Sequence, residues 1–261
     1  MLMDRSFGNL LNEVPTVRVG GMPISVLDRR GAAELMIRVA QSRERRGRPL
    51  YFTSVNGEAI ARASRDPDLA AVFLAADQIL ADGQPLVIAS RLLCRMPLPE
   101  RVATTDLVHD VARLAEKTGA SFYLLGSEEE ENERAVAALR RAYPKLRIVG
   151  RCHGFLEGEA LLAKLSEINA LAPDILWLGL GVPIEQQFVL DYSHLLPNVG
   201  VIKTSGGLFN HISGKNRRAP LWMQRIGFEW LWRVLMEPRR LFWRYLTTNP
   251  LAIYAMLRYS E

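Results

Sequence analysis

The stretch that decides the fold is Ile175-Leu176-Trp177-Leu178-Gly179-Leu180-Gly181-Val182-Pro183, an apolar run that ends in a glycine-rich turn. A continuous apolar run of this kind is typical of a strand that is buried on both faces, as the strands of parallel sheets are. Residues 183–194 follow with a helical pattern, and a second apolar run occupies residues 199–202. The stretch therefore predicts a strand, a tight turn, a helix and a parallel strand.

The same alternation continues toward both ends of the chain. Further strands are predicted at residues 50–55, 78–80, 122–125 and 147–149, and further helices at 84–93, 106–118, 128–143 and 158–171, with others opening at Gly57 and Pro67. Near the start, two short strands flank Gly20-Gly21, and Asp28 is placed to cap a helix running toward Arg45-Arg46. The pattern predicts an α/β fold, a parallel sheet with helices on both faces.

Ligands of such sheets bind beyond the carboxyl ends of the strands. The residues that follow the predicted strands are Asn56, Asp82, Gly126-Ser127, Gly179-Leu180-Gly181 and Thr204-Ser205-Gly206-Gly207. A carboxylate at Asp82 can be a general base, or it can simply cap the next helix. Arg101 follows Pro99-Glu100 in a loop, where an arginine is more often a surface residue.

Two short motifs have a more ordinary interpretation than the one their letters suggest. Asp66-Pro67-Asp68 matches the metal-binding DxD pattern, but Asp66 stands where a helix N-cap is expected and Pro67 suits the first helical position. Gly179-Leu180-Gly181 opens a dinucleotide fingerprint whose third glycine would fall on Ile184. We therefore predict no metal and no NAD-type cofactor.

The C-terminal segment differs from the rest of the chain in composition. Residues 215–261 contain nine Lys/Arg and three acidic residues, a net charge of +6, and four of the five tryptophans. Helices are predicted from Pro220 to before Pro238, from there to Thr247, and after Pro250. We expect an α/β catalytic domain at 1–214 and a helical, membrane-binding appendage at 215–261.

Arginine and tryptophan together favour an anionic membrane surface as the partner of this segment. Nucleic acid is the rival polyanion, but the basic residues are interleaved with apolar ones rather than forming a polar stripe, so we expect no nucleic acid. The N-terminus has no secretory pattern and no stretch is apolar enough to span a bilayer. Cys94 and Cys152 lack metal-ligand spacing. A cytoplasmic protein, peripheral on the inner face of the membrane, is predicted.

Taken in order along the chain, several short motifs point to one known family. They are Ser54-Val55-Asn56, Ala81-Asp82-Gly83, Pro99-Glu100-Arg101-Val102, Asp106-Leu107, Tyr123-Leu124-Leu125-Gly126, His153-Gly154-Phe155, Gly179-Leu180-Gly181-Val182-Pro183, Gly206-Gly207-Leu208-Phe209, Arg218-Ala219-Pro220-Leu221-Trp222-Met223-Gln224, Glu229-Trp230-Leu231-Trp232-Arg233 and Glu237-Pro238-Arg239-Arg240. With these motifs the chain, from about residue 17 to residue 257, resembles the WecG/TagA/CpsF glycosyltransferase family (family 26). The resemblance implies a Rossmann-like fold and an inverting, metal-independent transferase without a cofactor.

The resemblance also implies substrates and residue roles. Typical members transfer N-acetylmannosamine from a UDP donor to N-acetylglucosamine linked to undecaprenyl diphosphate, in bacterial surface polysaccharide synthesis. Asp82 becomes the expected base and Arg101 the family's motif arginine. Substrate contacts are expected at Ser54, Asn56, Gly126, Gly179, Gly181, Glu185, Gln186, Gly206, Gly207 and Asn210. Contacts to the diphosphate or the membrane are expected at Arg217, Arg218, Arg225, Arg233, Arg239 and Arg240.

The chain departs from the family pattern at three places along the ligand edge. Ala103-Thr104, Ile184-Glu185-Gln186 and Asn210 stand where the family usually has Thr-Gly, Lys-Gln-Glu and Asp. Glucose or a uronic acid in exopolysaccharide synthesis is therefore an alternative donor sugar. A sugar-nucleotide oxidoreductase or epimerase is a more distant alternative. The sequence leaves the oligomeric state open, a homo-oligomer included.

Overall fold

A six-stranded parallel sheet organises the chain, with strand order β4-β3-β8-β7-β5-β6. The computed structural model describes residues 11–42 and 47–261. The strands are β3 (Leu50–Val55), β4 (Gln78–Ala81), β5 (Ser121–Gly126), β6 (Arg147–Cys152), β7 (Ile175–Gly179) and β8 (Val201–Thr204). β3, β5, β7 and β8 are buried over nearly their whole length, as their apolar runs predict.

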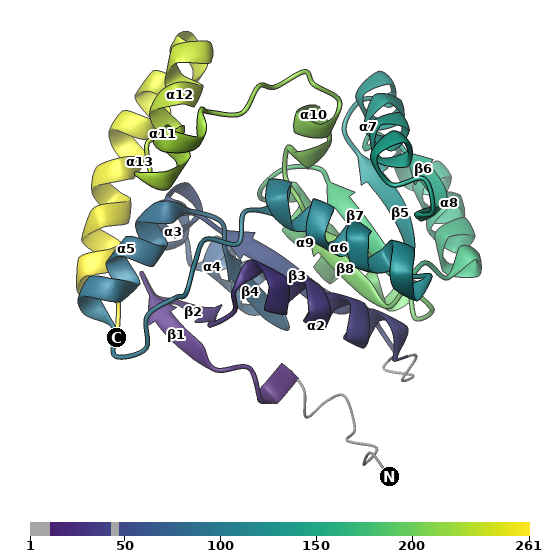
Figure 1. The fold of residues 1–261 in the computed structure, drawn as a ribbon, viewed down its shortest axis with the longest axis horizontal. Coiled ribbons are helices and arrows are strands. Elements are labelled where there is room, and N and C mark those ends of the chain that lie inside the picture. Colours follow the sequence, from purple (N-terminus) through teal and green to yellow (C-terminus); the bar gives the residue numbers. More distant parts are fainter. Residues whose placement is uncertain (1–10, 43–46) are drawn as a thin grey trace.

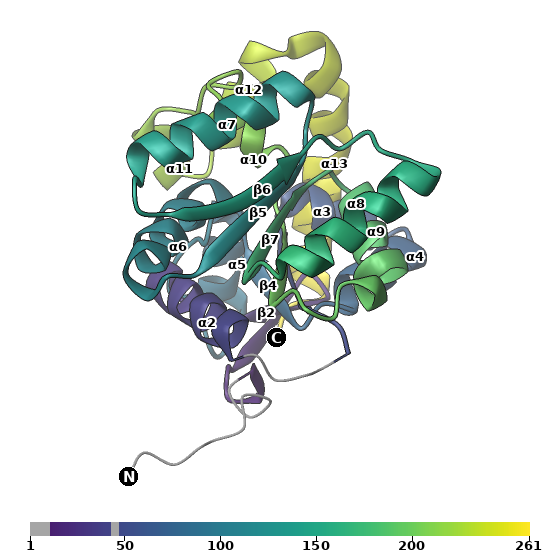
Figure 2. The same cartoon turned by 90° about the vertical axis from the view of Figure 1, so that its right-hand side faces the viewer.

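Helices cover both faces of the sheet, and Figure 2 shows α2 and α6 on one side of it and α8 and α9 on the other. One core cluster joins the sheet to α2 (Arg29–Gln41), α6 (Thr104–Thr118), α7 (Glu129–Ala142) and the short α10 (Leu208–Ile212). A second joins it to α8 (Gly158–Leu171) and α9 (Ile184–Tyr192), which continues as a 3-10 turn at Ser193–Leu195. The predicted α/β fold is therefore confirmed.

A third core cluster lies at the β4 edge of the sheet, where the first hairpin and the C-terminal helix meet (Figure 1). It includes the antiparallel hairpin β1 (Thr16–Val19) and β2 (Met22–Ser25), with α3 (Gly57–Ala63), α4 (Pro67–Leu74), α5 (Gln84–Leu93) and α13 (Pro238–Arg258). The Gly21 amide donates to the Tyr259 carbonyl at 2.8 Å. The C-terminus is therefore fastened to the first hairpin.

The C-terminal helices differ from the prediction in two ways. The helix expected from Pro220 to before Pro238 is two helices, α11 (Leu221–Arg225) and α12 (Glu229–Met236), because Gly227 adopts a φ of 83° between them. The break expected at Pro250 is wrong, since α13 continues through it. Proline in a helix interior costs about 3 kcal/mol. Burial of Ala252, Ala255 and Met256 in the next turns offsets that cost.

The division of the chain after residue 214 stays a prediction, but the packing of α13 bears on it. Ala252, Ala255 and Met256 belong to the same cluster as Ile60 of α3 and Val19 of β1. A cut after residue 214 would therefore expose part of the core. Within the described ranges, no helix has both the length and the hydropathy that crossing a bilayer requires.

Local helix signals in the sequence correspond well to the structure. Asp28, Asn56 and Asp66 cap α2, α3 and α4, and their side chains accept hydrogen bonds from Gly31, Ala59 and Leu69. The capping interpretation of Asp66 is thus confirmed. Helix α2 ends at Gln41, and Arg45-Arg46 lie outside the described residues. The short helix α10 was not predicted.

Candidate active site

Two adjoining cavities open at the carboxyl edge of the sheet. The smaller, of about 470 Å³, is lined by Ser54, Asn56, Asp82, Arg101, Thr104 and Glu185 from the α/β body and by Gln224, Glu229, Trp230, Arg233, Arg244 and Tyr245 from the C-terminal helices. The larger has a volume of about 920 Å³. Both are lined by Arg62, Gly181, Gly206 and Gly207, so the glycine loops form the boundary between them.

Asp82 follows β4 directly and lies in the smaller cavity. Its backbone amide continues the ladder by donating to the Val55 carbonyl at 2.8 Å, and its Oδ2 accepts from the Thr104 amide at 3.3 Å. Burial raises the pKa of the Asp82 carboxyl above its ordinary value, while the charges of Lys203 and Arg101 act in the opposite direction. Such a carboxylate is a stronger proton acceptor than one exposed to water.

Ser54 and Asn56 stand at the end of β3, beside Asp82. The Asn56 Oδ1 caps α3 by accepting from the Ala59 amide at 3.0 Å, and the residue also lines the smaller cavity. The Ser54 hydroxyl accepts from Lys203 Nζ at 2.9 Å and is 3.2 Å from the Thr104 hydroxyl. Both residues therefore combine a structural contact with a position in the cavity wall.

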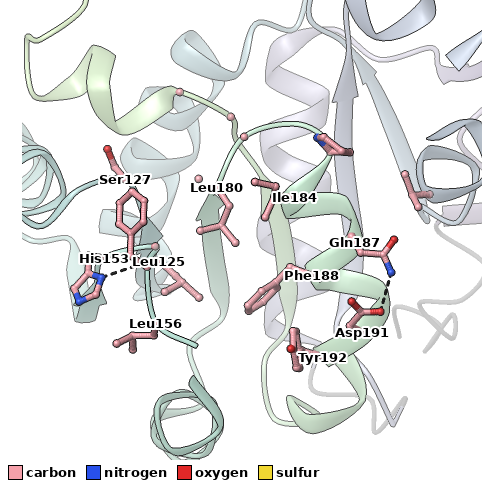
Figure 3. Close-up of a pocket in the computed structure, with 18 of the residues that line it drawn as sticks. Leu125, Ser127, His153, Leu156, Leu180, Ile184, Gln187, Phe188, Asp191 and Tyr192 are labelled. Carbon is pink, nitrogen blue, oxygen red and sulfur yellow. Dashed lines mark hydrogen bonds between the residues drawn. The ribbon is translucent and has the colours of Figure 1, made fainter. Parts of the chain in front are cut away.

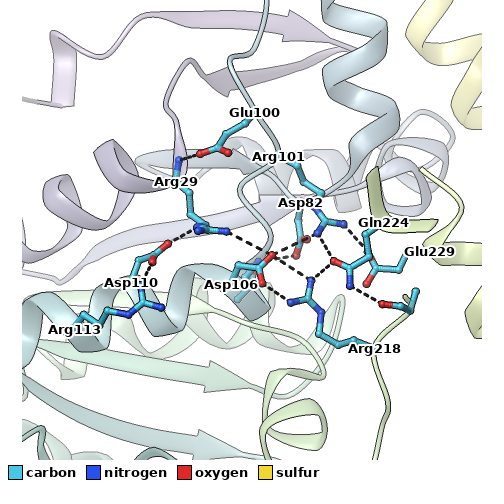
Figure 4. A network of polar contacts seen from close by, with 12 residues as sticks. Arg29, Asp82, Glu100, Arg101, Asp106, Asp110, Arg113, Arg218, Gln224 and Glu229 are labelled. Carbon is cyan, nitrogen blue, oxygen red and sulfur yellow. Dashed lines mark hydrogen bonds and ion pairs between the residues drawn. The ribbon is translucent and has the colours of Figure 1, made fainter. Parts of the chain in front are cut away.

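Arg101 is held at the junction between the body and the C-terminal helices (Figure 4). Its guanidinium donates to Glu229 at 2.6 Å and to Gln224 at 2.9 Å, and it lies 3.5 Å from Asp106 Oδ2. Arg218 donates to both carboxylate oxygens of Asp106 and to Gln224 at 2.8 Å. A network of alternating charges thus ties α11 and α12 to the edge of the sheet.

Asp106 is the anionic centre of this network. Burial alone would raise its pKa, but the hydrogen bond from Arg218 and the charges of Arg218, Arg101 and Arg29 outweigh burial and hold the pKa of the carboxyl below its ordinary value. The side chain is 27% exposed. Asp106 is therefore ionised at neutral pH and fixes two arginines in place.

Glu185 organises the glycine loops between the two cavities. Its carboxylate, 2% exposed, accepts from the amides of Leu180 at 3.3 Å, Gly181 at 3.2 Å and Gly206 at 2.9 Å. Burial raises the pKa of Glu185, which these amides and the charge of Lys203 partly counteract. These three amides are thus already engaged by an anion of the protein itself.

The remaining predicted contacts lie around these loops. Gly126 adopts a φ of 137°, and a Cβ there would stand 2.2 Å from the Gly179 carbonyl oxygen, so only glycine allows the two strand ends to approach. Asn210 lines the larger cavity and accepts from the Ser127 hydroxyl at 2.7 Å. Gln186 is buried, lines neither cavity and touches the site through Glu185 at 3.3 Å.

The larger cavity has mixed walls, shown in Figure 3. Leu156, Ile184, Phe188 and Tyr192 supply apolar surface, and the exposed Phe155 stacks on His153. Its polar groups include Asp66, Asp68, Glu128, Asp191, Gln187, Arg62 and Lys215. Aromatic surface beside hydroxyl-binding carboxylates suits a ring compound that carries hydroxyl groups.

The predicted arginines of the C-terminal segment fall into two sets. Arg218 and Arg233 face inward, the first on Asp106 and the second in the wall of the smaller cavity. Arg217, Arg225 and Arg239 are exposed on the outside, and the side chain of Arg240 lies outside what the structure describes. Sequence alone did not separate these sets, because the separation depends on how α11 to α13 dock.

Several polar residues of the site were missed. Arg244 lines the smaller cavity and is 3.3 Å from Glu58, while its buried Nε and Nη2 have no hydrogen-bond partner among the described residues. Lys203, in the centre of β8, was not singled out, although a lysine within an apolar strand is an unusual signal. Asp106, Gln224 and Glu229 were noticed only within family motifs.

Comparison with known proteins gives a consistent result. Residues 17–261 match the family model described as Glycosyl transferase WecG/TagA/CpsF family. A relative from Bacillus subtilis (strain 168) is 31% identical over 199 residues, 76% of this chain and 75% of its own length. Relatives from Bacillus spizizenii and Staphylococcus aureus (strain MW2) are 29% and 27% identical, over 81% and 74% of this chain and 80% and 74% of their own lengths.

All three relatives are named N-acetylglucosaminyldiphosphoundecaprenol N-acetyl-beta-D-mannosaminyltransferase. The match covers both the sheet edge that carries Asp82 and the C-terminal helices. An oxidoreductase or epimerase is accordingly no longer an alternative. The chain is a glycosyltransferase, and it belongs to the WecG/TagA/CpsF family.

Proposed function

We propose that this enzyme transfers N-acetylmannosamine from UDP to N-acetylglucosamine carried on undecaprenyl diphosphate. The names of the relatives support this transferred sugar and this acceptor. The observation that carries the proposal is the composition of the smaller cavity, which is lined by Asp82 together with Arg101, Arg233 and Arg244. A base and a set of cations across one cavity are what glycosyl transfer from a nucleoside diphosphate requires.

In the proposed reaction Asp82 takes the proton of an acceptor hydroxyl. The acceptor oxygen forms a bond to the anomeric carbon as the bond from that carbon to the UDP oxygen breaks on the opposite face, so the configuration inverts. General-base assistance of this kind contributes about 100- to 10,000-fold. The raised pKa of Asp82 suits the role, because a weaker acid has a stronger conjugate base.

UDP leaves with additional negative charge, which the site must stabilise without bulk water. Arg233 and Arg244 come from the C-terminal helices and Arg62 from α3, and all three line the smaller cavity. Arg244 lines this cavity, and its charge would act on a diphosphate bound there. The nucleoside then extends past Gly206 and Gly207 into the larger cavity, where carboxylates are available to its ribose hydroxyls.

The outer surface of the C-terminal helices supports peripheral binding to the inner face of the membrane. Trp222, Leu235, Trp243 and Leu257 are each more than 60% exposed on α11 to α13. Arg217, Arg225 and Arg239 are exposed among them. Apolar insertion together with phosphate pairing is the usual means of such binding, and it would bring the site to its lipid-linked acceptor.

The decisive experiment incubates the purified enzyme with a panel of UDP-sugars and undecaprenyl-diphosphate sugars and identifies products by mass spectrometry. We expect one N-acetylhexosamine to be added from UDP-N-acetylmannosamine, and the same product in excess EDTA. Transfer only from UDP-glucose or a UDP-uronic acid would show that the donor sugar is not N-acetylmannosamine. Loss of transfer in EDTA, restored by Mg²⁺ or Mn²⁺, would show that the reaction needs a metal.

The alternative donor sugars have a specific basis in the site. Asn210, in the wall of the larger cavity, stands where the family pattern has aspartate, and Glu185 shapes the loop between the cavities. An amide at Asn210 both donates and accepts hydrogen bonds, whereas a carboxylate only accepts. Glu185 lines the smaller cavity, where the sugar is transferred, and glucose or a uronic acid would present different groups there than an N-acetylated sugar. The panel therefore includes both.

A further inference from the structure

Lys203 is a buried cation that the transfer mechanism above does not use. It lies in β8, paired with Phe52 of β3 on one side and with Trp177 of β7 on the other, and its exposed fraction is 0%. Lysine is almost never buried completely unless its charge is paired or hydrogen-bonded. A lysine at the centre of the sheet therefore calls for a specific reason.

Hydrogen bonds lead from this lysine to the candidate base. Lys203 Nζ donates to the Thr204 carbonyl at 2.7 Å and to the Ser54 hydroxyl at 2.9 Å. The Ser54 hydroxyl is 3.2 Å from the Thr104 hydroxyl, and the Thr104 amide donates to Asp82 Oδ2 at 3.3 Å. The chain of contacts thus runs from β8 through β3 to the start of α6 and ends on Asp82.

The direction of these bonds constrains Ser54. An ammonium group only donates, so one lone pair of the Ser54 oxygen is taken by Lys203. The Ser54 proton must then point to Thr104 or into the cavity. Lys203 therefore fixes Ser54 as a donor, either to Thr104 or to a ligand in the smaller cavity.

The charges around Lys203 come from two other elements. Asp82 after β4 and Glu185 of α9 are the acids that act on it, and Arg101 and Glu229 act in turn on Asp82. Burial lowers the pKa of Lys203 to about 8, although both carboxylates act to raise it. The charge of Lys203 in turn lowers the pKa of Asp82 and of Glu185.

We propose that Lys203 is a positioning residue of the transfer site: its buried ammonium orients the Ser54 hydroxyl and keeps Asp82 ionised for its role as base. The proposal rests on the transfer reaction proposed above. The charge of Lys203 also acts on Glu185, whose carboxylate holds the glycine loops. Lys203 therefore influences two acids that line the smaller cavity, Asp82 and Glu185.

The test separates charge from hydrogen bonding. Lys203→Met removes both and fills similar space, whereas Lys203→Gln removes the charge and keeps a donor for Ser54. In both variants the acidic limb of the kcat/KM profile should move to higher pH by about one unit, because Asp82 loses a neighbouring cation. Turnover should fall about tenfold or more in Lys203→Met and less in Lys203→Gln, which still orients Ser54. Lys117→Met, an exposed lysine of α6, is the matched control and should leave the profile unchanged.

A second readout does not depend on activity. The carboxyl carbon of Asp82 can be titrated by NMR in ¹³C-labelled protein, with its signal assigned by its loss in Asp82→Asn. The pKa of Asp82 should be higher in Lys203→Met than in the wild type, with both proteins folded by circular dichroism. An unchanged Asp82 titration would overturn the proposal, whatever the activity. Should the wild type transfer no sugar while the Asp82 shift is observed, the proposed function fails and the coupling of Lys203 to Asp82 stands.

Discussion

Asp82 and Asp106 are two carboxylates at the same edge of the sheet, and their surroundings move their pKa values in opposite directions. Burial raises the pKa of Asp82, whereas Arg218, Arg101 and Arg29 together outweigh burial and lower that of Asp106. Separation of this kind assigns different tasks to chemically identical groups. We infer that Asp82 accepts a proton during catalysis and that Asp106 remains charged to hold arginines in place.

The role of Asp82 can be tested by one substitution. Asp82→Asn keeps the shape of the side chain and removes its basicity, so turnover should fall by at least about 100-fold. The affinity for UDP, measured by calorimetry, should change little, because the amide can still accept from the Thr104 amide. Turnover near that of the wild type would remove the assignment.

The role of Asp106 can be tested through the free energy of unfolding. Asp106→Asn leaves Arg218 and Arg101 without their shared anion, and we expect a loss of about 2 kcal/mol in urea unfolding at pH 7. The pKa of Asp106 in the folded protein lies below the ordinary value of about 3.9. The stabilisation by ionised Asp106 is therefore complete above about pH 3.9 and is lost as the pH falls through the lower pKa of the folded protein.

The matched control for Asp106 is Glu133→Gln on α7. Glu133 is 67% exposed, and its ion pair with Arg151 is long, at 3.8 Å. Removal of its charge should therefore change the free energy of unfolding by less than about 0.5 kcal/mol. If the two variants unfold alike at pH 7, the network does not stabilise the fold.

Sequence reasoning found the residues whose roles are local. Asp28 and Asp66 were placed at helix starts because capping depends on neighbours a few residues away. Arg244 and Lys203 were missed because their partners lie on distant segments: Glu58 for the first, and Ser54, Asp82 and Glu185 for the second. Lys203 meets these three partners only because β8 packs between β3 and β7.

At the scale of elements, the strands were predicted well and the C-terminal helices were not. Buried parallel strands have a continuous apolar pattern that tertiary context seldom overrides, as in β3 and β7. Pro250 is a strong local stop signal, but α13 passes through it because the following turns pack against α3 and β1. The prediction failed where burial outweighed local propensity.

The two faces of α13 differ in a way that matched substitutions can measure. Ala255 has an exposed fraction of 0%, and Ile253, two residues earlier, is 55% exposed. Ala255→Asp buries an unpaired charge and should destabilise the protein by about 3 kcal/mol or more in thermal or urea unfolding. Ile253→Asp should stay within about 0.5 kcal/mol of the wild type. Equal stabilities would mean that α13 does not pack on the body, and the cut after residue 214 would then be harmless.

At the scale of the whole molecule, exposed large apolar residues are concentrated on the C-terminal helices. Leu221, Trp222, Leu235, Met236, Phe242, Trp243, Leu246, Ile253, Tyr254 and Leu257 are all exposed on α11 to α13. The net charge of this segment, +6, is opposite in sign to that of anionic lipid. Composition predicted this surface from the sequence, but which residues are exposed depends on how α13 packs.

Membrane binding should therefore depend on a few of these residues. The double variant Trp243→Ser, Leu246→Ser should lose most of its binding to vesicles of anionic phospholipid in a sedimentation assay, because each buried apolar side chain contributes about 1.5–3 kcal/mol. Part of the wild-type binding should resist high salt, since apolar insertion is not screened. Phe155→Ser, a change at an aromatic residue that is 69% exposed but lies outside these helices, should bind as the wild type does. Undiminished binding of the double variant would contradict this surface.

The charge network that joins Arg101 and Asp106 to Gln224, Glu229 and Arg218 closes the site from the C-terminal side in the free protein. An enzyme whose lid opens only at an oil–water interface is activated by that interface. A site that is already assembled in water needs no such activation. We expect a membrane to act on this enzyme only by concentrating its acceptor. The enzyme should then behave as a tethered catalyst, whose intrinsic rate constant is the same on a vesicle as in solution.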